Sequence, residues 1–463
     1  MILCLPRLLS KLFSQASSPR HEGGRNVTIY VIVRNDEYLL DRIGNPLKQT
    51  LSFSQDERII TLWRRIVVGI LLTLVGFQLR SVILAVPPVL PLIQHDLGLS
   101  YSETGLLTSL PTLVLACFAW PVGVLAERVG PRLCVSLGLI LLALGTLLRA
   151  VWVSAIALFL FTFLLSLGIV LAQTAVPVLI RRWFPNAIGS VAALFSDGLI
   201  IGEAVAAGST LPLMEQFWGK DGWVATFIFW GLPVFVLLAL WLIIAPRASA
   251  LNVSSPVPEA LNAELMHKDK LLSPQRTGVS ALHLGILVGA GSLIYFGMNA
   301  WIASYNQALH HSSLTPLVLT ILNSAQLPVS LAITVIAQQV AGRRLPFIVA
   351  GVICVCSIMG WIFTPVTLEP LWATLLGGSS AMVFTLGIAL PPLLAAPHEV
   401  GRLTGITISL TYAVAFLGPF VGGALWDIFQ IPAISFTPVI VASLALILLG
   451  SLLPSRDAFG LPP

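Results

Sequence analysis

Charge is what this sequence has least of: only 10% of its 463 residues are Asp, Glu, Lys or Arg, while 57% are hydrophobic. A soluble domain carries about a quarter charged residues, so the composition excludes an ordinary soluble protein. A bilayer-spanning helix needs roughly 20 consecutive apolar residues, and twelve such windows follow one another along the chain. We therefore predict an all-α membrane protein with twelve transmembrane helices in two six-helix halves. The windows lie near residues 66–94, 103–125, 133–151, 155–180, 187–214, 223–245, 279–308, 314–338, 345–364, 371–394, 402–426 and 433–453.

Residue types that commonly carry catalysis or bind metals are also scarce. The sequence has five cysteines, four of them in or beside apolar windows, and seven histidines that are scattered or loop-bound. We expect the cysteines to be apolar filler rather than disulfides or metal ligands. The absence of a phosphate-binding Walker loop excludes ATP-driven transport by this chain alone. We predict that the protein is not an enzyme and binds no cofactor and no metal.

Polar segments divide the twelve windows six and six. The stretch after the sixth window is rich in Pro, Ser and charge, which is typical of a flexible connector. We expect a flexible cytoplasmic N-terminal tail over 1–60, a first six-helix half over 61–246, a cytoplasmic connector over 247–278, a second half over 279–454 and a cytoplasmic C-terminal tail over 455–463.

Basic residues lie mainly on one side of this predicted topology, whereas the opposite loops carry only Arg149 and Lys220. By the positive-inside rule, we expect a multi-pass protein of the cell membrane with both termini in the cytoplasm. The net charge of +5 then reflects topology, and we expect no nucleic-acid binding. The basic residues of the cytoplasmic side are Arg64, Arg65, Arg128, Arg132, Arg181, Arg182, Arg247, Lys268, Lys270, Arg276, Arg343, Arg344, Arg402 and Arg456.

The loop after the second window contains a specific motif, "GVLAERVGPR". It resembles the signature between helices two and three of the major facilitator superfamily, a glycine-x-leucine-alanine-acid-arginine-x-glycine-x-basic pattern. A tight turn with one acid and two basic groups can hold helix ends together and release them, so we predict a gating role. The gating candidates are Gly123, Glu127, Arg128, Gly130 and Arg132. The matching loop of the second half, "AQQVAGRRLP", has a basic pair and no acid.

A narrower resemblance covers most of residues 66–453. The segments "LLTLVGFQLRSVILAVPPVLPLIQHDLGLS", "AVPVLIRRWFP", "GSLIYFGMNAWI" and "FLGPFVGGALWD" are similar to the cyanate permease and 2-nitroimidazole transporter family within that superfamily. The resemblance implies a single-chain secondary transporter for small polar or anionic solutes, without a cofactor, and we expect it to act as a monomer in the lipid bilayer. The chain departs from that family's pattern by placing acids, Asp197 and Glu203, in the fifth window.

Arg80 is the only charge between residues 66 and 93. A charge at the bilayer centre costs on the order of 2.5 kcal/mol or more, so such a residue indicates a functional site. As an anion anchor, its guanidinium would present a planar fork of donors to a small solute. As a structural charge, it would be paired with Glu203 or Asp197. Both interpretations can hold at different stages of a transport cycle.

The two acids of the fifth window are the proton-coupling candidates. Glu203 shares a helical face with Ser196 and Thr210, while Asp197 lies about 100° from Ser196 around the helix. A carboxylate in a dry cavity can load and release protons, and Glu203 is the better placed of the two. We therefore predict H⁺ as the coupling ion.

Polar residues repeat with helical spacing in several other windows. We expect the residues of windows four, seven and eight to line a substrate cavity, with Trp301 either capping that cavity or packed as an aromatic. The threonines of window eleven, Thr404, Thr407 and Thr411, we interpret as packing residues between helices, and Asp427 as facing water. The substrate-binding candidates are Arg80, Gln173, Tyr295, Asn299, Trp301, Asn323 and Gln326.

Two other functions fit parts of the sequence. A proton-coupled drug exporter of the same superfamily is the main alternative, although that subgroup would be expected to have an arginine in the fourth window, where "FTFLLSLGIVLAQTAV" has none. A non-transporting membrane sensor is the second alternative, and it lacks a recognisable signalling domain in the tail or connector. The sequence leaves the solute, the direction of transport and the coupling stoichiometry open.

Overall fold

The computed structural model describes residues 55–185, 187–219, 222–246, 281–340, 343–394 and 400–453. The predicted connector and C-terminal tail lie outside the described residues, as does the predicted N-terminal tail up to residue 54. The first helix begins at Gln55, inside the segment that we expected to be tail.

Within the described residues the chain is built from helices, and twelve of them or their joined pairs are long and apolar enough to span a membrane. The twelve predicted spans are therefore confirmed. The helices are α3 (Gln55–Leu84), α4 (Leu90–Leu97), α5 (Tyr101–Val129), α6 (Pro131–Val151), α7 (Ala155–Trp183), α8 (Ile188–Phe217), α9 (Trp223–Ile244), α11 (Ala281–Ala308), α12 (Thr315–Ser324), α13 (Gln326–Val340), α14 (Leu345–Phe363), α15 (Glu369–Leu394), α16 (Val400–Phe429) and α17 (Thr437–Ser451).

Two of the spans are interrupted at prolines. The first changes from α3 to α4 through a 3₁₀ turn at Pro87–Val89, because proline has no N–H for the helical ladder and its ring clashes with the preceding turn. The eighth is divided into α12 and α13 at Ala325, where Pro328 lacks the N–H that would bond the Ser324 carbonyl. The candidate site described below lies beside both interruptions.

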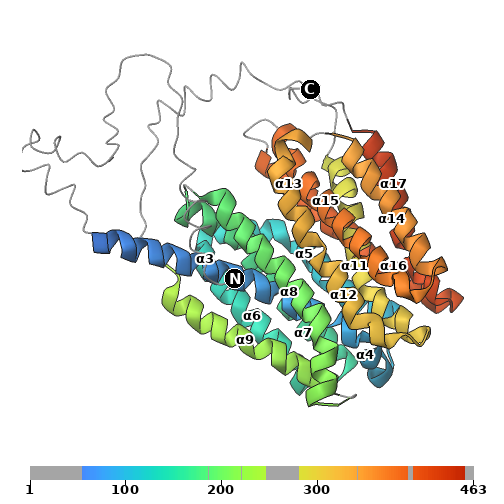
Figure 1. Ribbon diagram of the computed structural model, residues 1–463. Helices are drawn as coiled ribbons and strands as arrows, with labels where there is room; N and C mark the ends of the chain where they lie inside the picture. The colour runs from blue at the N-terminus through green and yellow to red at the C-terminus, as the bar shows by residue number, and fades with distance from the viewer. Residues whose placement is uncertain are drawn as a thin grey trace, which may run out of the picture.

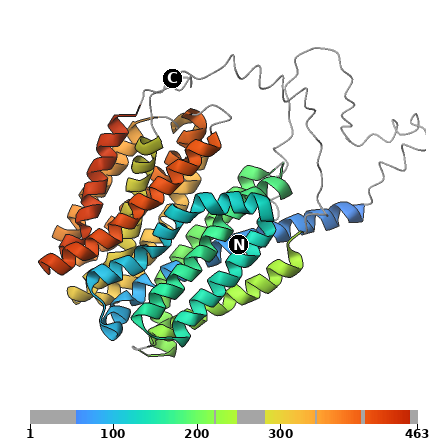
Figure 2. The ribbon, with the colours of Figure 1, turned by 180° about the vertical axis from the view of Figure 1, so that it is seen from behind.

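The helices form two groups, α3 to α9 and α11 to α17 (Figures 1 and 2). Within the first group, α3 packs closely on α8 because Gly198 and Gly202 lie against the Thr73 and Phe77 backbone. The GxxxG spacing of the fifth window therefore serves helix packing. The two groups meet where α5 runs along α16 and α8 along α12.

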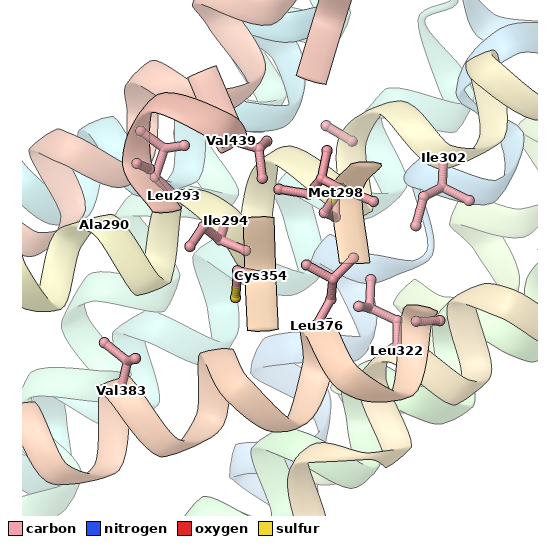
Figure 3. Close-up of a cluster of buried hydrophobic side chains, with 14 of the residues drawn as sticks. Ala290, Leu293, Ile294, Met298, Ile302, Leu322, Cys354, Leu376, Val383 and Val439 are labelled. Carbon is pink, nitrogen blue, oxygen red and sulfur yellow. The ribbon is translucent and has the colours of Figure 1, made fainter. Parts of the chain in front are cut away.

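The interior of each group is apolar. In the second group, Ile294 and Met298 of α11 pack with Cys354 of α14 and Leu376 of α15 (Figure 3). Many large hydrophobic side chains are instead exposed on the outside, such as Ile156, Ile243 and Phe363, each at least 79% exposed. Such an exposed apolar surface is what lipid tails would cover.

Candidate functional site

A cavity of about 420 Å³ lies between the two helix groups. Its walls come from α3, α7 and α8 on one side and from α15 and α16 on the other. Most of the lining surface is apolar, although eight of the seventeen lining residues have polar side chains. The residues that line it are Arg80, Gln173, Pro177, Ile180, Arg181, Ile188, Ala192, Phe195, Ser196, Leu199, Phe384, Ile388, Thr404, Thr407, Ile408, Thr411 and Tyr412.

The cavity reaches the surface at one end of the bundle. We call this the connector end, because α9 ends there and α11 begins there. Arg181 and Ile188, which line the cavity at the end of α7 and the start of α8, are both exposed. At the opposite end, which we call the closed end, the start of α5 is bound to the end of α16: Asp427 accepts hydrogen bonds from the Tyr101 and Ser102 backbone N–H groups at 2.9 and 2.7 Å.

Arg80, which lines this cavity, forms an ion pair with Glu203. The Arg80 Nε and Glu203 Oε1 atoms are 3.3 Å apart, and both side chains are more than nine-tenths buried. The guanidinium also lies over the Phe296 ring, 5.8 Å from its centroid. Arg80 falls halfway along the first span, Trp63–Leu97, so the charge that the sequence singled out is at mid-membrane depth and its structural partner is Glu203.

A chain of amide and hydroxyl groups continues from this ion pair into the second helix group. Gln326 donates from Nε2 to the second Glu203 oxygen at 3.1 Å. Tyr295 donates its hydroxyl to Asn323 Oδ1, and Asn323 Nδ2 donates to Asn299 Oδ1 at 2.9 Å. The structure thus brings together four of the predicted binding residues, on α11, α12 and α13, next to Glu203. None of the four is among the residues that line the 420 Å³ cavity, so the expectation that windows seven and eight line it was wrong.

Gln173 also lies in the cavity wall, where its Nε2 donates to the Tyr412 hydroxyl at 3.1 Å. Tyr412 was not predicted as a site residue from the sequence. It directly follows Thr411 and is otherwise surrounded by apolar residues, so it did not add to the helical spacing of polar residues. The threonines of window eleven were misinterpreted: Thr404, Thr407 and Thr411 line the cavity. The Thr407 and Thr411 hydroxyls are buried and have no hydrogen-bond partner within the described part of the chain.

Three predicted residues lie elsewhere. Trp301 is fully buried at the closed end, packed against Tyr101 and Trp426 with ring centroids 6.3 and 5.6 Å away. Asp197 is half-buried on α8 but is not among the residues that line the cavity. Asp427, which we expected to face water, is instead the acceptor that joins α16 to α5.

The predicted gating motif forms the turn between α5 and α6. Gly130 alone joins the two helices, with φ +95°, a conformation that residues with a side chain rarely adopt. Arg132 donates from Nη2 to the Leu242 carbonyl at 3.0 Å and so binds the end of α9. Gly123 is partly exposed and Arg128 is exposed. The Glu127 side chain lies outside what the structure describes.

We expected Arg149 to lie in a loop, and this prediction was wrong. Arg149 occupies the last turn of α6, is only 2% exposed, and lies over the Phe227 ring at 4.4 Å from the centroid. The signal that could have found it is its position inside the predicted window 133–151. In the part of the chain that the structure describes, no group of three or more His, Cys, Asp or Glu residues is arranged to hold a metal ion.

Comparisons with known proteins agree with this architecture. The model of the Major Facilitator Superfamily matches residues 66–419. The chain is 26% identical to a cyanate transport protein of Escherichia coli K12 over 78% of its length and 90% of the relative's. It is also 26% identical to a 2-nitroimidazole transporter of the same organism, over 78% of this chain and 88% of that one. Among solved structures, a D-xylose–proton symporter superposes with a TM-score of 0.68 at 12% identity, covering 85% of this chain and 99% of that one.

Proposed function

This chain belongs to the Major Facilitator Superfamily, and we propose that it carries a small polar or anionic solute across the cell membrane by alternating access, with H⁺ as the coupling ion. Its relatives are transporters, and it is a transporter of the secondary kind. The solute class, the coupling ion and the residues that bind them are our inference from the cavity.

The observation that carries the proposal is the Arg80–Glu203 ion pair beside the cavity. An arginine presents planar, parallel donors that fit a carboxylate or another small planar anion. Removing one partner of a buried ion pair leaves an uncompensated charge. An anionic solute that binds Arg80 would therefore replace Glu203 as its partner, and Glu203 would be left without its counter-charge.

The remaining polar groups fit the same role. The Thr407 and Thr411 hydroxyls need partners, and a solute near Arg80 could supply them because all three residues line the cavity. A volume of about 420 Å³ with a mainly apolar lining surface and several polar groups is typical of a site for a small molecule. The two relatives are named as transporters of cyanate and of 2-nitroimidazole, and both compounds are small enough for such a site.

The conformation fits one state of the transport cycle. Exposed arginines surround the connector end, among them Arg181, Arg182, Arg343 and Arg344. By the positive-inside rule this end is the cytoplasmic one. The cavity then opens to the cytoplasm and is sealed from outside by the α5–α16 contact.

Ligand-induced thermal stabilisation of the detergent-purified protein tests the role of Arg80. We expect cyanate or a small carboxylate to raise the melting temperature in a concentration-dependent way, by the equivalent of about 2.7 kcal/mol at 100 times Kd. Arg80→Gln should abolish the shift, whereas Arg343→Gln, an exposed arginine at the connector end, should keep it. Stabilisation by lipophilic cations or neutral heterocycles alone, unchanged in Arg80→Gln, would instead favour a drug exporter.

Two acids on α8 allow a matched test of proton coupling. In proteoliposomes, Glu203→Gln should still exchange solute but lose accumulation driven by a pH gradient, because no carboxylate remains to release a proton. Asp197→Asn, which removes an acid of the same helix that forms no ion pair with Arg80, should accumulate solute normally. Accumulation by Glu203→Gln equal to that of the parent would rule out Glu203 as the proton carrier.

A further inference from the structure

The second buried arginine has neither a counter-charge nor a full set of acceptors. The Arg149 Nε and Nη2 atoms are buried, and neither has a hydrogen-bond partner among the residues described. Arg80–Glu203 and His95–Asp96 are the ion pairs found in the described ranges, so Arg149 is paired with no described carboxylate. The site also lies apart from the solute cavity, whose lining does not include Arg149.

Such a group is expensive to bury. Removing one ion from water into a protein interior carries a large free-energy penalty. The contact of Arg149 with the Phe227 ring, 4.4 Å from the centroid, offsets only part of that penalty. The aromatic contact alone therefore leaves most of the desolvation penalty of Arg149 uncompensated. Neutral water could accept hydrogen bonds from the guanidinium but would not balance its charge.

A small cavity adjoins this guanidinium. It has a volume of about 30 Å³ and is lined by Arg149, by Thr162 of α7, by Leu107 and Thr108 of α5, and by Phe296 and Asn299 of α11. A water-sized particle needs roughly 10–15 Å³ measured in this way. The space thus accommodates a monatomic ion or a molecule of two or three atoms, and excludes a larger organic acid.

The lining provides a second unused donor. The Thr162 hydroxyl is buried and has no partner within the described ranges, and the residue is 3% exposed. No Asp or Glu lines the cavity. Two residues with unused donors, from different helices, therefore line one small space whose lining carries a net positive charge.

We propose that this cavity is a binding site for a small inorganic anion of chloride size, held between the Arg149 guanidinium and the Thr162 hydroxyl. The anion supplies both the missing charge and the missing acceptor. The proposal does not depend on which solute the transporter carries.

Phe296 is shared by the surroundings of the two buried arginines. Its ring centroid lies 5.8 Å from Arg80 Cζ, and the residue also lines the Arg149 cavity. Arg149 itself does not line the solute cavity, so we expect Arg80 and Arg149 to be testable by separate substitutions.

Direct detection uses bromide as an anomalous scatterer. In crystals of the full-length parent protein grown with bromide, we expect an anomalous peak between Arg149 and Thr162. In detergent solution, exchanging gluconate for chloride at constant ionic strength should raise the melting temperature of the parent and of Arg80→Gln. No bromide peak, together with equal melting temperatures in chloride and gluconate, would overturn the proposal.

Substitutions assign the effect to the site. Arg149→Met should remove the chloride-dependent shift. Because that variant could fail to fold, Thr162→Val gives a milder test: losing one hydrogen bond to a charged group should raise the chloride midpoint about tenfold. The matched control is Thr146→Val on α6, whose hydroxyl is equally buried but already bonds the Leu142 carbonyl, and it should leave the midpoint unchanged. Equal midpoints in the Thr162 and Thr146 variants would contradict the assignment.

Discussion

The two ends of the helix bundle differ in how the helix groups meet. At the closed end, Asp427 accepts from two backbone N–H groups and from the Ser102 hydroxyl, and Tyr101 stacks on Trp426 with centroids 4.1 Å apart. At the connector end, the cavity separates α7 and α8 from α15 and α16. The closed end depends on a few directional contacts between groups, which can be broken and reformed as the groups rock.

Glycines show the same contrast. At the closed end, a Cβ on Gly105 would collide with the Pro419 carbonyl, and one on Gly423 with the Tyr101 carbonyl. Toward the connector end, Gly123, Gly189 and Gly405 have open space where a Cβ would be. Among the residues that the structure describes, Gly105 and Gly423 thus allow close contact between the groups at the end that is sealed in this conformation.

The largest expected effect comes from filling the contact at the closed end. Gly105→Val should force α5 and α16 apart, because the added atoms meet backbone that cannot rotate away. Overpacking of this kind costs about 1–3 kcal/mol, and sometimes more, so the melting temperature should fall clearly. Gly123→Val on the same helix adds the same atoms in open space and should leave the melting temperature nearly unchanged. Equal losses in both variants would show that valine disturbs α5 itself and not the contact between groups.

Removing the carboxylate at the closed end should have a smaller effect. Asp427→Asn keeps the size of the side chain and an accepting oxygen, but weakens the charge-assisted hydrogen bonds from Tyr101 and Ser102. The loss is only the difference between a bond to a charged group, about 1.5–3 kcal/mol, and a neutral one, about 0.5–1.5 kcal/mol. We expect the closed end to open more often. The measurement is the rate at which a thiol reagent labels a cysteine introduced by Thr108→Cys, in the parent and in the Asp427→Asn background. A cysteine at Ser102 is unsuitable because Ser102 is itself part of the contact.

The control for this measurement is Glu103→Gln. Glu103 belongs to the same helix start but bonds only its own cap residue, Ser100. Labelling of the reporter thiol on α5 should therefore stay at the parent rate. If Asp427→Asn labels no faster than Glu103→Gln, the carboxylate does not hold the end closed.

Much of the fold follows from the sequence, because a membrane admits only structures that satisfy their own backbone hydrogen bonds. Apolar windows of about 20 residues therefore predict helices, and all twelve are present. The breaks at Pro87 and Ala325 were not predicted, since hydropathy averages over a proline and hides the missing N–H.

The site was harder to predict because it depends on how each helix is rotated about its axis. The sequence left Glu203 and Asp197 open as partners of Arg80, and the structure pairs Arg80 with Glu203. Helical spacing did not reveal Tyr412 in the cavity wall or Asp427 as the acceptor for another helix. Arg149 was assigned to a loop because it lies near the end of its window, yet the helix continues to Val151 and buries it.

The smallest expected effect lies at the connector end, in the turn between α5 and α6. Arg132→Gln removes the hydrogen bond to the Leu242 carbonyl, which at this exposed position should contribute about 0.5–1.5 kcal/mol. We expect a melting temperature lower by a few degrees at most, since no contact between the two groups is lost. Arg128→Gln, an exposed arginine of the same motif, serves as the control for charge alone. One outcome would extend the role of Arg132: Arg132→Gln leaves stability intact but slows solute exchange, whereas Arg128→Gln changes neither stability nor exchange. Arg132 would then act when the connector end closes. The two ends would differ in this conformation, but both would be held shut by directional hydrogen bonds between helices.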